Sequence, residues 1–189
     1  MKNRKFVVAA FLLAAAMLLG VGYAALTDTL DITGSADINV TDMEKAYEDD
    51  IYFVTAVALD PDDDDQTVNP NTASVNSQNN DKASFSAKSL SKKGDKAKFT
   101  FTIANTSVHT VTVEPKLNAS AGNTNPTWFK ITSDWNGAAQ TIAASDGTTA
   151  KTITYTVTIE LLQDPTEAVS GSFLIELVAT AGTTNSGSN

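Results

Sequence analysis

The sequence predicts an all-β protein, an antiparallel β-sandwich of the jelly-roll or immunoglobulin-like kind. In most segments rich in β-branched and aromatic residues, apolar and polar residues alternate with a period of two, as in strands with one buried face. Turn residues recur about every ten positions. No amphipathic helical pattern follows residue 24. Together these observations favour many short strands packed as two sheets.

Residues 1–24 predict a signal peptide. Lys2, Arg4 and Lys5 form a positive start, residues 6–21 are almost entirely apolar, and Gly22-Tyr23-Ala24 supplies small residues before a cleavage site. We therefore expect a signal peptidase to cut between Ala24 and Ala25, which would leave a secreted protein without a membrane anchor. The alternative is a retained anchor, because residues 6–26 carry no charge and are long enough to span a bilayer.

Residues 25–40 are predicted to form a strand at the start of the mature chain. Its even positions, from Leu26 to Val40, are apolar or small except Asp28, and its odd positions are polar. This pattern is typical of an extended strand with one buried face. Such a strand can complete the chain's own sheet or be added to a neighbour's sheet. The alternation itself leaves both possibilities open.

Residues 41–181 are expected to form the sandwich domain. Residues 51–59 are almost all apolar, which predicts a central strand buried on both faces. Pro115 lacks a backbone N–H and places its strand at an edge or a bulge. Trp128 and Trp135 are expected in the core. Residues 60–81 are predicted to be a surface loop and residues 182–189 a flexible tail; the remaining strands are predicted at 82–88, 96–105, 109–117, 127–135, 138–144, 149–162 and 171–180.

The charge of the chain limits its partners. The formal net charge is −9, and removal of residues 1–24, with three basic and no acidic residues, makes it −12. Nucleic acid is therefore not an expected partner, because its binding requires clustered Lys and Arg. The chain has no cysteine, so its fold depends on core packing rather than on disulfides.

The residues needed for common catalytic sites are missing. His109 is the only histidine, so zinc sites built from two or three imidazoles cannot form, and no thiol nucleophile exists. We expect no enzyme and no cofactor. One acidic run is a weak candidate for Ca²⁺ binding, because clustered carboxylates suit hard cations. It lacks the alternating spacing of a calcium loop, so a solvated surface loop is the better interpretation. This run comprises Asp60, Asp62, Asp63, Asp64 and Asp65.

Two segments resemble the TasA/camelysin family of secreted Gram-positive matrix proteins. The junction Gly22-Tyr23-Ala24-Ala25-Leu26-Thr27-Asp28 is similar to the site that a specialised signal peptidase processes in that family, with Leu26 where the family has Phe. The turn Leu90-Ser91-Lys92-Lys93-Gly94-Asp95 is similar to the family's L-x-P-G-D turn, with Lys93 in place of Pro. The strand with Phe99 and Phe101 and the turn Asn105-Thr106-Ser107 follow it, as in the family.

The resemblance implies a jelly-roll subunit of extracellular biofilm-matrix fibres, whose partners are further copies of itself and matrix accessory proteins. It implies that the mature N-terminal strand completes the sheet of the next subunit, with Leu26, Leu30 and Ile32 as anchors and Gly34 as the hinge of the donated segment. The alternative is a monomeric secreted or surface sandwich that binds a ligand or accessory partner and keeps the strand in its own sheet. A camelysin-type metalloendopeptidase is less favoured, since the metal ligands are missing.

Overall fold

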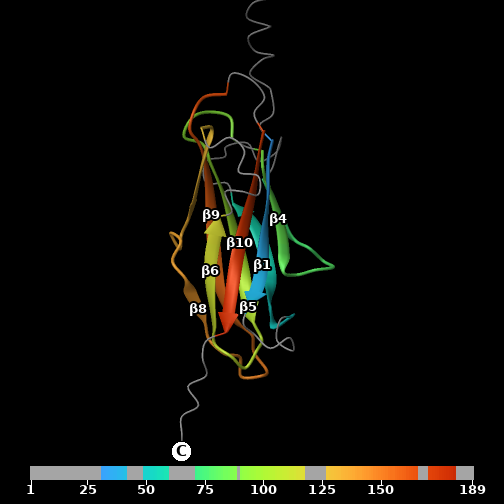
Figure 1. Cartoon of the computed structure of the whole chain (residues 1–189). Helices are drawn as coiled ribbons and strands as arrows, with labels where there is room; N and C mark the ends of the chain where they lie inside the picture. The colour runs from blue at the N-terminus through green and yellow to red at the C-terminus, as the bar shows by residue number, and fades with distance from the viewer. Residues whose placement is uncertain are drawn as a thin grey trace, which may run out of the picture.

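The chain folds into two packed β-sheets (Figure 1). The computed structural model describes residues 31–41, 49–59, 71–88, 90–117, 127–165 and 170–181. One sheet has the strand order β3-β4-β1-β10-β6-β8, and the other β2-β5-β9-β7. The predicted all-β sandwich is confirmed. The strands are β1 (Asp31–Thr41), β2 (Ile51–Leu59), β3 (Thr72–Val75), β4 (Lys82–Ala87), β5 (Lys96–Asn105), β6 (Val111–Leu117), β7 (Phe129–Ser133), β8 (Gln140–Ile142), β9 (Lys151–Leu161) and β10 (Ser170–Ala181).

One strand pair departs from the antiparallel arrangement. β1 and β10 are parallel, in register from Asp31↔Ser170 to Thr41↔Thr180, whereas the other paired strands are antiparallel. Figure 1 shows the β1 and β10 arrows side by side and pointing the same way. Because the first and last strands run in parallel, β1 begins and β10 ends at opposite ends of the sandwich.

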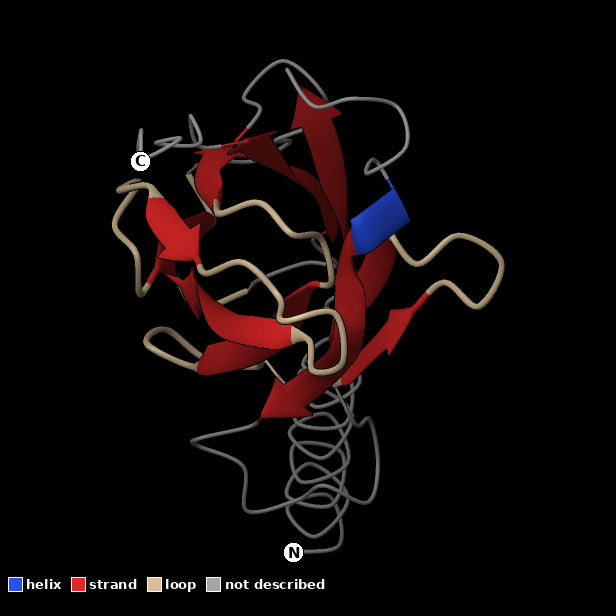
Figure 2. Ribbon diagram, turned by 90° about the horizontal axis from the view of Figure 1, so that it is seen from below, coloured by secondary structure: helices blue, strands red, loops and turns tan. Residues whose placement is uncertain are grey.

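The core lies between the sheets, and the strands surround it when the molecule is seen along its long axis (Figure 2). Alternate residues of each strand point into it, as period two requires. The rings of Phe85 and Phe99, from opposite sheets, have centroids 4.8 Å apart, and those of Phe53 and Phe101 are 5.7 Å apart. The inward positions predicted for β5 are all completely buried: Ala97, Phe99, Phe101 and Ile103.

The prediction for residues 51–59 is wrong in one respect. β2 is an edge strand of its sheet, not a central strand. Val54, Val57 and Leu59 are 48%, 46% and 48% exposed, so only one face of the strand packs on the core. The register with β5 shifts between Phe53 and Thr55, which marks a β-bulge. The continuous apolar run hid this one-sided burial, because half-exposed valine and leucine look like core residues in the sequence.

A short strand lies within the predicted loop 60–81. β3 pairs with β4 from Thr72↔Ser86 to Val75↔Ala83, and the hydroxyl oxygens of Ser74 and Ser84 are 3.1 Å apart. Residues 60–70 of the predicted loop lie outside the described residues. β3 does alternate, with Thr72 and Ser74 against Ala73 and Val75, but four residues are too few for this pattern to stand out in the sequence.

One turn and one strand edge follow from local residue types. Asn136 and Gly137 form a turn in which both residues have positive φ, 50° and 79°. Pro115 lies in β6 beyond Val111–Val113, the part that pairs with β8, so in the described structure that end of β6 is an edge. Proline is tolerated at such a place, because one side of the strand has no partner strand there.

Helical structure is scarce in the described part of the chain. A single 3₁₀ turn occupies residues 49–50. No helix among the described residues has the length and apolar character that crossing a membrane requires. The predicted signal peptide and tail lie outside the described residues.

Candidate functional site

The candidate assembly residues are only partly described. Ala24, Ala25, Leu26 and Leu30 lie outside the described residues, as do Asp60 and Asp62–Asp65 of the acidic run. Ile32 and Gly34 lie in β1, so the structure brings these two candidates together in one strand. The surroundings of β1 therefore form the candidate site.

β1 fills a slot in the interior of the six-stranded sheet. It pairs with β10 on one side and with β4 on the other, from Ile32↔Ala87 to Asp37↔Lys82. The backbone N–H of Ile38 extends the β4 side by donating to the Asp81 carbonyl oxygen at 2.8 Å. Without an extended segment between them, β4 and β10 would each present a row of unpaired backbone groups. In this structure the chain's own β1 occupies the slot.

The inward face of β1 anchors it. Ile32 and Ala36 are 0% exposed and Ile38 is 6% exposed. A buried isoleucine side chain contributes about 1.5–3 kcal/mol relative to exposure, so the two isoleucines supply most of the apolar stabilisation of the strand. The alternation predicted for this strand is confirmed over the residues that the structure describes.

Gly34 lies under the ring of Phe85. The two residues are cross-strand partners, and a Cβ atom added to Gly34 would lie 2.0 Å from Cζ of Phe85. Phe173 of β10 is the partner of Gly34 on the other side. The strand continues in regular pairing on both sides of Gly34. In this sheet the glycine makes room for a ring, and the hinge that the resemblance implies for a donated strand stays a prediction.

The outward face of β1 makes two polar contacts. Lys82 Nζ lies 3.5 Å from Asp37 Oδ2, joining β4 to β1. Asn39 Nδ2 donates to Glu176 Oε1 at 3.2 Å, joining β1 to β10. Both pairs are exposed, so each contributes little stability, typically about 0–1 kcal/mol for such an ion pair. They connect β1 to both of its neighbours.

Sequence reasoning identified β1 but missed its partners. Phe85, Lys82 and Glu176 lie far from β1 in the chain, and only the strand order shows that they meet it. One signal was present: Gly34 interrupts an apolar face otherwise made of Ile32, Ala36 and Ile38. A lone glycine on such a face often marks a close approach of another group.

No catalytic arrangement is visible in the described residues. His109 lies in the turn between β5 and β6, and its carbonyl oxygen accepts a hydrogen bond from Asn105 Nδ2 at 2.8 Å. Within the described ranges, no three His, Cys, Asp or Glu side chains are grouped so that they could hold a metal ion.

A recess of about 290 Å³ opens beside the edge of β7. Its lining includes Pro115, Ile131, Tyr155 and Ile175, with Ser133 among the polar groups. Burial raises the pKa of the Tyr155 phenol, while the hydrogen bond with Ser133 opposes that rise. Neither an acid–base pair nor a nucleophile with its base lines the recess, so its described lining offers only a small, mainly apolar surface.

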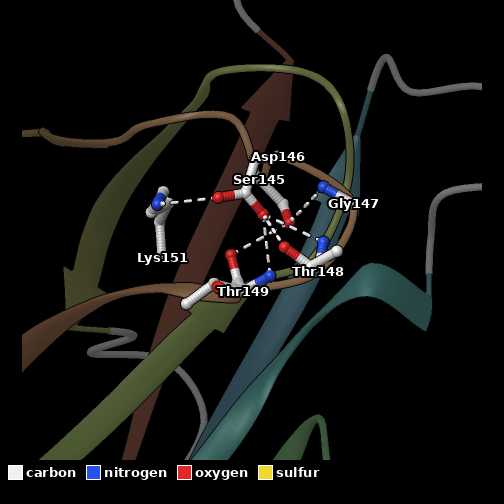
Figure 3. Close-up of polar contacts among 6 residues, drawn as sticks. All are labelled: Ser145, Asp146, Gly147, Thr148, Thr149 and Lys151. Carbon is white, nitrogen blue, oxygen red and sulfur yellow. Dashed lines mark hydrogen bonds and ion pairs between the residues drawn. The ribbon is translucent and has the colours of Figure 1, made fainter.

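The loop between β8 and β9 is closed by one carboxylate (Figure 3). Asp146 Oδ1 accepts hydrogen bonds from the backbone N–H of Thr148 and of Thr149 at 2.9 and 2.8 Å and from Thr148 Oγ1 at 2.7 Å. Lys151 Nζ lies 3.6 Å from Asp146 Oδ2. The Thr148 hydrogen bonds, then that from Thr149, and the Lys151 charge lower the pKa of Asp146. The carboxylate therefore stabilises the turn.

No protein-family model matches the sequence, and no curated protein matches it. The functional argument therefore depends on the slot around β1.

Proposed function

We propose that this protein is a secreted structural subunit of an extracellular fibre, and that neighbouring copies assemble by exchanging their first strand. The observation that supports this proposal best is the position of β1, the first described strand, in the interior of the six-stranded sheet. Its departure would leave a slot between β4 and β10 that only an extended segment can fill. A neighbour's β1 fits that slot as well as the chain's own.

The topology supports exchange. Among the described strands β1 comes first, so its C-terminal end alone connects it to the others, and it can leave without threading past them. A second copy offers the same inward isoleucines and the same polar groups. Exchange of an identical element between protomers costs little, because the neighbour's strand restores the interactions that the chain's own strand made.

One-way donation of β1 gives a filament, whereas reciprocal exchange between two copies gives a closed dimer. If each copy donates at one end and accepts from the next copy, the contact is heterologous and continues without closing. Backbone pairing over the length of β1 would give a durable junction.

A second candidate function is a monomeric secreted or surface sandwich that binds a ligand or accessory partner. The observation that favours it is that β1 is already seated in the chain's own sheet, with Ile32 and Ala36 completely buried. The two candidates differ in whose β1 fills the slot. An enzyme is not proposed.

Electron microscopy of the mature chain, residues 25–189, tests the proposal. We expect filaments from the intact chain and none after deletion of residues 25–33, with the far-ultraviolet circular dichroism of strands retained. Filaments that persist after the deletion would exclude an exchange that depends on residues 25–33, which include the proposed anchors Leu26, Leu30 and Ile32. A strictly monomeric intact chain at high concentration would favour the second candidate.

A further inference from the structure

The alternation of β1 leaves its register ambiguous. A slip by one residue would turn the polar side chains of Thr33, Ser35 and Asp37 into the core and the apolar ones out to solvent, which is strongly unfavourable. A slip by two residues keeps every apolar side chain inside and every polar one outside. The hydrophobic pattern alone therefore cannot distinguish the observed register from its two nearest alternatives.

The contact between Gly34 and Phe85 removes this ambiguity. In the observed register Gly34 faces Phe85, and a slip by two residues would bring either Ile32 or Ala36 to that place. Both residues carry a Cβ atom, and a Cβ at that place lies 2.0 Å from Phe85 Cζ. The ring cannot move aside freely, since Phe85 is 3% exposed and its centroid lies 4.8 Å from that of Phe99.

The contact between Asp37 and Lys82 favours the same register. Asp37 is directly opposite Lys82 when Gly34 faces Phe85, and in that register Asn39 reaches Glu176 diagonally from its place opposite Val178. After a slip by two residues, Asp37 would face Ser84 or Asn80 in place of Lys82. Exposed contacts of this kind are weak. Gly34 and Phe85 therefore determine the register of β1, and the polar contact adds a small further preference.

We propose that Gly34 and Phe85 form a register lock, so that the slot between β4 and β10 accepts an extended segment only when a glycine faces Phe85. The partner that fits is an alternating segment with apolar residues on one face and a glycine among them, as in β1 of a second copy. The lock acts on the chain's own β1; its action on a neighbour's β1 rests on the proposed function.

Disulfide trapping tests the lock directly. The natural chain has no cysteine, so a pair introduced by mutation forms the only possible bond. Ser35 and Ser84 are cross-strand partners on the outer face, and the variant S35C/S84C reports the observed register. The variant T33C/S84C joins diagonal neighbours and reports a slip by two residues. Diagonal pairs are about 7–8 Å apart, beyond the usual reach of a disulfide, so the second variant is the matched control.

We expect S35C/S84C to oxidise within one chain at least about tenfold faster than T33C/S84C, because only the first pair has the Cα separation that a disulfide needs. Adding Gly34→Ala should slow the first pair at least about tenfold, since the added Cβ cannot stay under the ring and a slip by two residues would only bring Ile32 or Ala36 there instead. Unchanged trapping of both pairs with Gly34→Ala would overturn the lock.

A second variant covers the case in which Gly34→Ala fails to fold. Phe85→Ala removes the ring, so Gly34→Ala should then add no further loss of stability, and T33C/S84C should begin to form a disulfide. If Gly34→Ala lowers the stability of the Phe85→Ala variant as much as it lowers that of the natural protein, the lock is refuted. Disulfides within one chain test the lock, whereas disulfides between chains test strand exchange, so the two proposals fail separately.

Discussion

Asn105 accepts a hydrogen bond from the hydroxyl of Ser107 at 2.7 Å, and these residues are 0% and 1% exposed. Asn105 Oδ1 also accepts from the Ser107 backbone N–H at 2.9 Å. Its Nδ2 donates to the carbonyl oxygens of His109 and Ala143, at 2.8 and 3.0 Å. One buried carboxamide thus fixes the β5–β6 turn and ties it to the segment after β8.

Replacing Asn105 with alanine should destabilise the fold strongly. The change leaves buried donors and acceptors without partners, and each such group costs about 1–3 kcal/mol, so we expect a loss of about 2–4 kcal/mol in the free energy of unfolding. Urea denaturation measures it. Asn39→Ala is the matched control, since it removes one exposed hydrogen bond, and its loss should stay below about 1 kcal/mol. Equal losses would contradict the assigned role of Asn105.

Trp135 is a core residue with one polar function. It is 8% exposed, its ring centroid lies 4.8 Å from that of Tyr155, and its Nε1 donates to the Thr154 carbonyl oxygen at 2.9 Å. We expect Trp135→Ala to cost about 3–5 kcal/mol, as in other buried aromatic truncations. Trp128 is half-buried, so Trp128→Ala should cost clearly less. Chemical denaturation measures the free energy of unfolding of both variants. A larger loss for Trp128→Ala than for Trp135→Ala would contradict the assignment of Trp135 as the core residue.

The Asp146 turn predicts a pH dependence of stability. Its hydrogen bonds, together with the Lys151 charge, lower the pKa of Asp146 in the folded chain. A lowered folded pKa means that the carboxylate stabilises the fold fully above its ordinary pKa of about 3.9 and loses this effect as pH falls towards the folded pKa. Asp146→Ala should therefore lower the thermal midpoint at pH 7, and the difference from the natural protein should narrow steadily below pH 4. A difference that stays constant down to pH 2.5 would contradict this.

Truncating side chains on the two faces of β1 should change the free energy of unfolding by very different amounts. Ile32 is completely buried, so Ile32→Ala should lower the free energy of unfolding by about 2–5 kcal/mol. Thr33 points outward, and Thr33→Ala should change it by less than about 0.5 kcal/mol. Denaturant titration of the two variants checks the face assignment. A large effect at Thr33 would mean that β1 lies in another register or orientation.

Local patterns were sufficient to predict most of the strands. β5 and β9 were predictable because regular alternation, such as Phe99 and Phe101 between threonines and lysine, survives in a strand with one buried face. β3 was not predictable, since its four residues form a strand only by pairing with β4. β2 was misplaced at the centre of a sheet because sequence reveals apolar character but not which strands lie beside it.

The candidate site shows the same division. The alternation predicted that one face of β1 would be buried, and the structure confirms this for Ile32 and Ile38. The role of Gly34 could not be predicted, because it depends on Phe85, which approaches from a strand about fifty residues later in the chain. Pairing register is a long-range property, and local composition carries little information about it.

The most direct test of strand exchange mixes two mature chains, one with Ser35→Cys and the other with Ser84→Cys. Each variant has a single thiol, and residues 35 and 84 face each other only across the β1–β4 pair. The proposed assembly predicts that mixing before oxidation gives a disulfide between one chain of each kind, within filaments. If each variant forms no mixed disulfide and stays monomeric at high concentration, β1 remains in its own sheet and the assembly proposal is wrong.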